Sequence, residues 1–148
     1  MRDNDLIKQL KKKNPKALDY IFNKYGNLIF KVSYSILNNR TLSEECVNDV
    51  LLKIWNNIDS FNKGDEKFKA WIIVMTKYTS IDMLRKEKIL FAIKTFDKKN
   101  KEIFIKRFFL NYSIKEISES IGISENAISN RIRRGKLKLS ELLIKEGF

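Results

Sequence analysis

Apolar residues recur at steps of three and four along almost the whole chain, which contains only one proline and five glycines. This period places apolar side chains on one face of an α-helix, whereas the residues of a half-buried strand alternate every second position. No stretch of the sequence alternates in that way. The chain is therefore predicted to be all-α.

Helix and turn signals divide the predicted fold into two domains. Residues 1–86 are expected to form an N-terminal four-helix domain, with helices near residues 5–12, 15–37, 41–58 and 68–86. Asn14 can cap the second helix and Pro15 can fill its first position, while Thr41 with Glu44 forms a capping-box pattern before the third. Residues 87–148 are expected to form a C-terminal domain, with helices near residues 88–95, 99–109, 113–121 and 124–143.

The net charge indicates a polyanionic partner. The chain has thirty Lys and Arg against eighteen Asp and Glu, and no histidine, which gives a formal charge of +12. Nucleic acid and an anionic membrane surface would both attract such a chain. The longest apolar run, residues 70–75, is far shorter than the roughly 20 residues that a membrane-spanning helix needs. The N-terminus also lacks the apolar core of a signal peptide, so a cytoplasmic location is expected.

The sequence argues against an enzyme. The absence of histidine removes the commonest general base, and neither a Gly-rich phosphate loop nor a GxSxG turn occurs. The single cysteine, Cys46, falls at an inward helical position and is expected to be a small buried hydrophobe. No metal and no cofactor are expected. The weakest alternative is an enzyme acting on nucleic acid through Asp49 and Asp82 at a metal ion.

A helix-turn-helix pattern occupies residues 113–136, SIKEISESIGISENAISNRIRRGK. Ser113 and Glu116 form a capping box, Gly122 suits the left-handed end of a helix, and Ser124 can cap the next helix. Six isoleucines are expected to face inward between the two helices: Ile114, Ile117, Ile121, Ile123, Ile128 and Ile132.

The second helix of this pattern carries side chains suited to duplex DNA. Asn126, Ser129, Asn130 and Arg133 are predicted on its outer face, where Asn can pair with adenine and Arg with guanine in the major groove. The flanking cations suit phosphates, and these are Arg131, Arg134, Lys136 and Lys138. The alternative is that this basic face is only solvated surface.

Three segments of the sequence together resemble the sigma-70 family, in its two-domain, extracytoplasmic-function-like form. They are SEECVNDVLLKIW (residues 43–55), FKAWIIVMTKYTSIDMLRK (residues 68–86) and KEIFIKRFFLNYSIKEISESIGISENAISNRIRRGKLKL (residues 101–139). The resemblance implies that the first segment docks on the clamp helices of the RNA polymerase β′ subunit. It implies that the second melts and reads the promoter −10 element and that the third reads the −35 element.

The resemblance also implies roles for individual residues. The implied polymerase contacts are the outward residues Glu45, Asn48, Asp49, Leu52 and Lys53. The implied contacts to single-stranded −10 DNA are Phe61, Asn62, Lys63, Lys77, Tyr78 and Arg85. Unstacked bases need aromatic faces with cations beside them, and Phe61, Trp71 and Tyr78 can supply such faces. Trp71 and Trp55 lie among apolar neighbours, so core packing is an alternative for both.

The implied function is a sigma factor that binds core RNA polymerase and directs it to promoters, with an inhibitory anti-sigma protein as a further partner. The main alternative is an autonomous DNA-binding regulator. The short connection near Glu87 is unusual for this family. The two promoter elements lie ~50 Å apart at ~34 Å per turn of DNA, whereas a connector of about five residues spans at most ~18 Å. Either the chain lacks a stretch that its relatives have, or it cannot engage both elements as they do.

Overall fold

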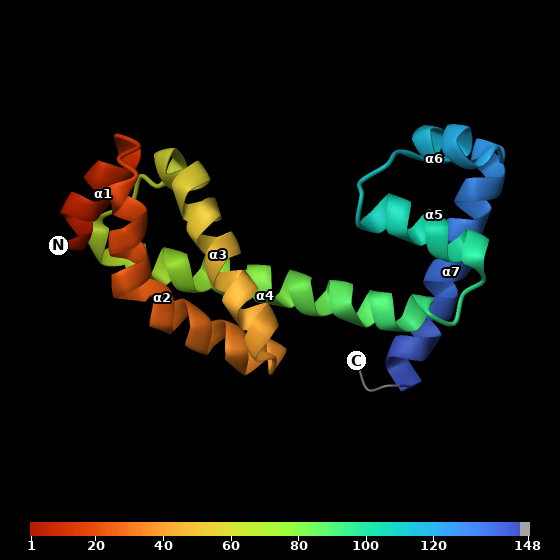
Figure 1. The fold of residues 1–148 in the computed structure, drawn as a ribbon, viewed down its shortest axis with the longest axis horizontal. Helices are drawn as coiled ribbons and strands as arrows, with labels where there is room; N and C mark the ends of the chain where they lie inside the picture. The colour runs from red at the N-terminus through yellow and green to blue at the C-terminus, as the bar shows by residue number, and fades with distance from the viewer. Residues whose placement is uncertain (146–148) are drawn as a thin grey trace. The chain divides into compact units, whose positions relative to one another are not determined.

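The computed structural model describes residues 1–145 and confirms the all-α prediction, with no strand in that range. The elements are α1 (Asp3–Lys11), α2 (Lys16–Leu37), α3 (Arg40–Asn57), the 3-10 helices η1 (Ile58–Ser60) and η2 (Asp65–Lys67), α4 (Phe68–Ile93), α5 (Lys98–Phe108), α6 (Ile114–Ile121) and α7 (Glu125–Lys145) (Figure 1). The chain divides into two compact units, one from Met1 to Arg85 and one from Lys86 onward. No helix within residues 1–145 is long and apolar enough to cross a membrane.

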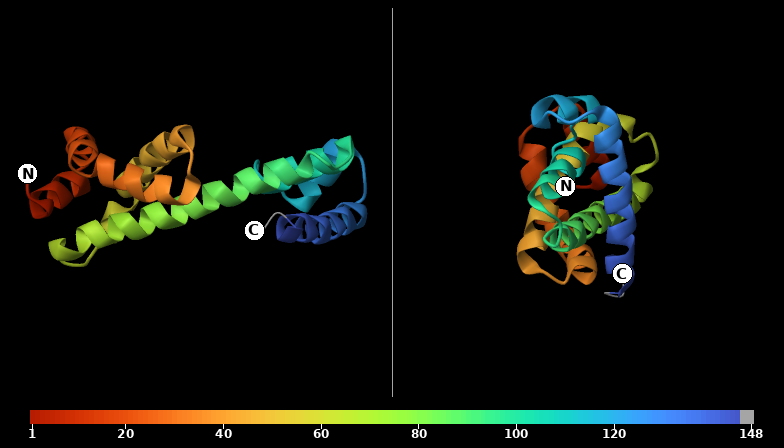
Figure 2. Two further views of the ribbon diagram at one scale, coloured as in Figure 1. Left: turned by 90° about the horizontal axis from the view of Figure 1, so that it is seen from below. Right: turned by 90° about the vertical axis from the view of Figure 1, so that its right-hand side faces the viewer.

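The first unit is built on one apolar core shared by α1, α2, α3 and the start of α4. Helices α2 and α3 pack along each other, and α1 lies against α2 (Figures 1 and 2). The fully buried side chains of this core include Leu6, Leu10, Ile21, Ile29, Ile54, Phe68 and Ile72. Cys46 is also fully buried, as predicted, with its Sγ 3.4 Å from the Ser80 hydroxyl.

An asparagine side chain accepts a backbone hydrogen bond at the start of α2 and another does so at the start of α3. The Asn14 side chain accepts a hydrogen bond from the Lys16 N–H at 3.1 Å, but α2 begins at Lys16 with Pro15 at its N-cap position, one residue later than predicted. The predicted cap of α3 is wrong, because Asn39 accepts from the Leu42 N–H at 2.9 Å and α3 already includes Thr41. Asn38, with φ of 49°, ends α2 in the left-handed region that Asn tolerates, so the turn between the two helices is shorter than expected.

Helix α4 also differs from the prediction, since it continues to Ile93 instead of ending near Lys86. The sequence between residues 85 and 93, RKEKILFAI, has no glycine, proline or capping residue that would end a helix. The separate helix expected at residues 88–95 is therefore the last part of α4.

The second unit packs the end of α4 with α5, α6 and α7 around two small apolar clusters. One cluster joins α4, α5 and α7 through Ala92, Ile93, Phe96, Phe104 and Leu139. The other is the isoleucine cluster predicted between α6 and α7, with Ile103 of α5 added to it. The helices α5 and α7 approach closely at Gly135, where an added Cβ would lie 2.3 Å from Phe104.

Candidate nucleic-acid interface

The helix-turn-helix in the second unit has the predicted local geometry. The Ser113 hydroxyl accepts from the Glu116 N–H at 3.0 Å, and the Glu116 carboxylate accepts from the Ser113 N–H at 3.3 Å. Gly122 has φ of 81° and ends α6, and the Ser124 hydroxyl accepts from the Ala127 N–H at the start of α7. Ile117 and Ile128 are fully buried between the helices. These contacts fix the crossing of α6 and α7 and leave one side of α7 in solvent.

The outer face of α7 carries the predicted polar set. Asn126, Ser129, Asn130 and Arg133 are all exposed, while Ile132 on the opposite face is buried. A groove of about 410 Å³ runs beside this face between Arg133 and Arg107 of α5. Side chains on such a face are free to reach base edges in a major groove.

Two residues of this groove were not predicted from the sequence. Leu137 is 60% exposed and lines the groove, and Arg107 lies on its other side. Leu137 follows Arg133 by four residues, so both lie on the same face of α7. A single leucine on this otherwise polar face could have been recognised from the sequence as a candidate contact residue. An exposed apolar side chain there suits the methyl group of thymine.

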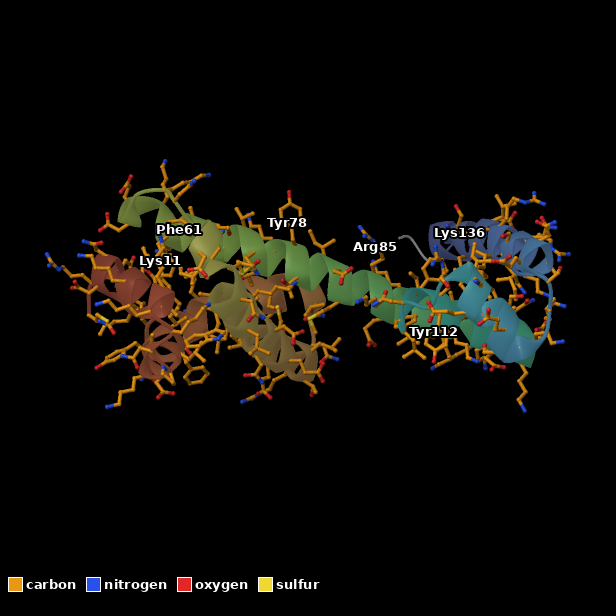
Figure 3. All side chains as sticks on the ribbon, turned by 90° about the horizontal axis from the view of Figure 1, so that it is seen from above. Lys11, Phe61, Tyr78, Arg85, Tyr112 and Lys136 are labelled. Carbon is orange, nitrogen blue, oxygen red and sulfur yellow. The ribbon has the colours of Figure 1, made fainter. Side chains whose placement is uncertain are left out.

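The cations that flank this face are held by neighbouring side chains. Arg131 donates to the Asn100 side chain at 3.0 Å and is half-buried. The Lys136 ammonium lies 5.5 Å from the Phe108 ring centroid, and the Lys138 ammonium lies 5.2 Å from that of Phe96. Lys136 is labelled in Figure 3. The exposed Arg134 completes the predicted set.

In the first unit, α4 presents an exposed stripe with a cation at one end. Tyr78 is 72% exposed and projects away from the helix, as does Arg85 in the same view (Figure 3). Val74 and Ile81 are exposed on the same stripe at steps of four and three, and neither was predicted as a site residue. Lys77 is exposed next to Tyr78. The stripe combines one free aromatic face with apolar and cationic neighbours.

The loop before α4 corrects the prediction for Phe61. That side chain is only 3% exposed and packs on Phe68 and Trp71, with ring centroids 5.6 and 5.0 Å away. It therefore offers no free ring face for a base. Trp71 is half-buried in the same cluster, in line with the core-packing alternative. Asn62 and Lys63 are exposed, as expected for loop contacts.

The outward face of α3 exposes all five of its predicted residues. Glu45, Asn48 and Asp49 are exposed, and Leu52 is 56% exposed. Lys53 is also exposed, and its ammonium donates to the Thr79 hydroxyl of α4 at 2.8 Å. That bond holds Lys53 against the unit to which it belongs.

A groove between α2 and α3 adjoins the α3 face and was not predicted. It has a volume of about 570 Å³ and is lined by Phe22 and Phe30 of α2 and by Val47 and Asn48 of α3. Phe22 is 53% exposed, although its side chain is large and apolar. Asn48 belongs both to this groove and to the α3 face. Within residues 1–145, no cluster of acidic or cysteine side chains could hold a metal ion.

The fold and these faces define an all-helical, helix-turn-helix protein with a second, separate helical unit. The family model described as Sigma-70 region 2 matches residues 21–89, and the one described as Sigma-70, region 4 matches residues 86–139. The chain therefore belongs to the sigma-70 family. Sigma factors direct RNA polymerase to promoters and are not enzymes.

Known relatives agree with this family. The chain is 32% identical over 82 residues to the ECF RNA polymerase sigma factor SigW of Bacillus subtilis strain 168, a match over 55% of this chain and 43% of SigW. It is 25% identical over 134 residues to the RNA polymerase sigma factor SigZ of the same organism, over 72% of this chain and 76% of SigZ. The chain thus spans less than half of SigW and about three quarters of SigZ.

Two solved structures are similar over most of the chain. One is the RsbN–BldN complex, with a TM-score of 0.48 and 19% identity, covering 93% of this chain and 99% of that one. The other is CnrH in complex with the cytosolic domain of CnrY, with a TM-score of 0.48 and 22% identity, covering 97% of each chain.

Proposed function

We propose that this sigma factor contacts polymerase through α3, single-stranded promoter DNA through α4 and duplex promoter DNA through α7. The observation that carries the proposal is the exposure of the residues that the family resemblance selects on those three helices. In this proposal, residues 1–86 form the domain that binds core polymerase and the −10 element, and residues 87–148 form the domain that binds the −35 element.

The proposed duplex contact uses α7 in two ways. Asn126, Asn130 and Arg133 read base edges in the major groove, since bidentate pairs with adenine and guanine discriminate among bases. Cations beside them bind phosphates, which sets register and affinity but carries no sequence information. The groove past Arg133 gives Leu137 access to a thymine methyl.

The proposed single-strand contact uses the exposed stripe of α4. A base that has left the duplex stack can rest on Tyr78, and base–aromatic stacking contributes about 1–3 kcal/mol per base. Lys77, Arg85 and Lys63 of the preceding loop supply charge for the backbone of that strand. Phe61 does not contact DNA in this proposal because its ring is buried, and it instead anchors the loop by packing on Phe68 and Trp71.

The proposed polymerase contact combines the α3 face with the adjoining groove. Leu52 and Phe22 are apolar anchors exposed to solvent, and Asn48 and Asp49 surround them with polar groups. Interfaces commonly have this arrangement of apolar centre and polar rim. We expect an anti-sigma protein, if it covers this face, to compete with polymerase, and we expect both to act in the cytoplasm.

The test is transcription by purified core polymerase across a promoter library, with and without the chain. Sequence-selective transcripts that depend on the chain are expected. The double variant Asn48→Arg with Asp49→Arg should lose polymerase binding and transcription while duplex binding persists. Asn4→Arg with Asp19→Arg adds the same charge at exposed positions elsewhere and should retain both. Duplex binding without any affinity for core polymerase would instead identify an autonomous regulator.

A further inference from the structure

A cationic pocket lies on the second unit, beside the first turn of α5 and apart from the base-reading face. It is open to solvent, has a volume of about 310 Å³ and is lined by Arg131, Arg134, Gly135 and Lys138 of α7 with Phe96, Asp97 and Asn100. That volume is at the small end of the roughly 300–1,000 Å³ typical of ligand sites. A group the size of a phosphate or a diphosphate fits such a space.

The pocket's cations form a stripe of their own on α7. Arg131, Arg134 and Lys138 follow one another at steps of three and four, so they share one side of the helix. At about 100° per residue, that side is rotated by about 100° from the side of Asn126, Asn130 and Arg133. A ligand in the pocket therefore leaves the base-reading side chains free.

The described residues that line the pocket do not balance its charge. Three cations line it against one carboxylate, which leaves two positive charges. Among residues 1–145, none of the three cations forms an ion pair. Both oxygens of Asp97 accept hydrogen bonds from Asn100, at 2.8 and 3.0 Å.

The beginning of α5 adds to this excess. Its first turn includes Lys98 and Lys99 and no acidic residue. Cations are unfavourable there, because the helix dipole already makes that end positive. An anion in the pocket would relieve both sources of repulsion.

The side chains of the pocket are held in place before any ligand binds. The Asp97 carboxylate accepts a hydrogen bond from the Asn100 side-chain amide and so orients it. The Asn100 side-chain oxygen accepts a hydrogen bond from the Arg131 guanidinium at 3.0 Å. The Lys138 ammonium rests over the Phe96 ring. The guanidinium of Arg131, oriented in this way, favours planar, two-pronged binding of phosphate oxygens, and the exposed Arg134 lies on the same side of α7.

We propose that this pocket binds a phosphate group, either of a free phosphate compound or of a DNA backbone. The free source goes beyond the function proposed above, and it would remove Arg131, Arg134 and Lys138 from the cations that bind DNA phosphates there. The backbone source rests on it, because it places one DNA phosphate beside α5 while α7 reads the bases.

The test is a titration of the whole chain with inorganic pyrophosphate, followed by amide NMR at constant ionic strength. Saturable shifts at residues 97–100 and 135 are expected. Arg134→Gln with Lys138→Gln should weaken binding at least about tenfold, since hydrogen bonds to charged groups are worth about 1.5–3 kcal/mol each. Lys16→Gln with Lys31→Gln removes the same charge from exposed positions of α2 and should bind as the parent does. Absence of saturable shifts, or equal affinity in both double variants, would overturn the proposal.

A second arm separates the two sources. The salt dependence of duplex DNA binding is measured for the parent and for both double variants. A backbone source predicts that the slope falls by about 0.9 per lost phosphate contact in the pocket variant alone, with pyrophosphate competing for the site. A free source predicts equal slopes in the two double variants and unchanged pyrophosphate binding in the presence of DNA. If the chain binds no duplex DNA but still binds pyrophosphate, the proposed function is wrong and the proposal that the pocket binds a phosphate group is supported.

Discussion

At the scale of single residues, two helical glycines differ in what a methyl group would meet. A Cβ at Gly135 would lie 2.3 Å from the fully buried Phe104 ring, whereas at Gly26 the nearest atom, on Phe22, is 3.5 Å away. Gly135→Ala should therefore destabilise the second unit by about 1–3 kcal/mol through overpacking. Gly26→Ala, as the matched control, should stabilise the first unit by about 0.5–1 kcal/mol. Urea unfolding followed by circular dichroism, with amide exchange in α5 and α7, checks both, and equal effects would contradict the close approach.

Tyr25 gives the first unit a pH dependence. Its hydroxyl donates to the Asp3 carboxylate, and burial, that hydrogen bond and the Asp3 charge together raise the pKa of Tyr25 above its ordinary value. The folded state thus keeps a proton that the unfolded state releases above about pH 10, so stability falls as the pH rises past that value.

The variant Tyr25→Phe tests this linkage. It should be about 1 kcal/mol less stable than the parent at pH 8, because one hydrogen bond is lost. The difference should shrink above about pH 10. Trp55 and Trp71 both lie in the first unit, so tryptophan fluorescence in urea reports on that unit. Tyr20→Phe alters an exposed tyrosine and should show no difference at either pH; a gap for Tyr25→Phe that stays constant with pH would argue against the linkage.

The residue scale also shows where sequence patterns are insufficient. The family resemblance implied that Phe61 lies in a loop with its ring free for a base, and the structure buries that ring. A pattern of spacing gives the side of a helix, but the neighbours that cover that side come from other elements. The three rings Phe61, Phe68 and Trp71 pack together only because the loop folds back on α4.

At the scale of elements, a capping-box pattern was not by itself sufficient to place a helix start. An Asn stands two residues before both predicted caps, yet Ser113 caps α6 as expected whereas Asn39 caps α3 in place of Thr41. Asn39→Ala should therefore destabilise the first unit by about 1 kcal/mol. Thr41→Ala, exposed inside the helix, should change stability by less than about 0.5 kcal/mol. Tryptophan fluorescence in urea compares the two, and a larger effect for Thr41→Ala would restore the original boundary.

Helix α7 separates reading from affinity along its length. Arg133→Ala should relax the preference at one position of the −35 element, at about 1–3 kcal/mol of discrimination. Lys136→Ala should weaken all sequences alike and reduce the salt slope by about 0.9. Binding selections with randomised duplexes at several salt concentrations distinguish these results. Equal losses on every sequence for both variants would mean that the two faces of α7 are wrongly assigned.

At the scale of the whole molecule, the helical type of the elements was predictable because the apolar period runs through them all, but the number of helices and the boundary between units were not, since two predicted helices are one continuous α4. The sequence predicted a break near Glu87, and α4 instead runs from Phe68 to Ile93. The matches to the two sigma regions overlap at residues 86–89. No non-helical residue therefore stands between them, which raises the question of how one chain engages two promoter elements.

An inserted connector tests that question directly. About 20 Gly and Ser residues between Arg85 and Lys86 would reach at most ~72 Å, which exceeds the ~50 Å between the two elements. If the parent engages one element at a time, the insertion should raise transcription from templates that carry both elements, because linked contacts act at a high effective concentration. It should leave templates with a single element unchanged. In vitro transcription with core polymerase on the three templates measures this. A parent chain that already requires both elements at their usual spacing would show that the continuous α4 is compatible with both contacts, and the insertion would then bring no gain.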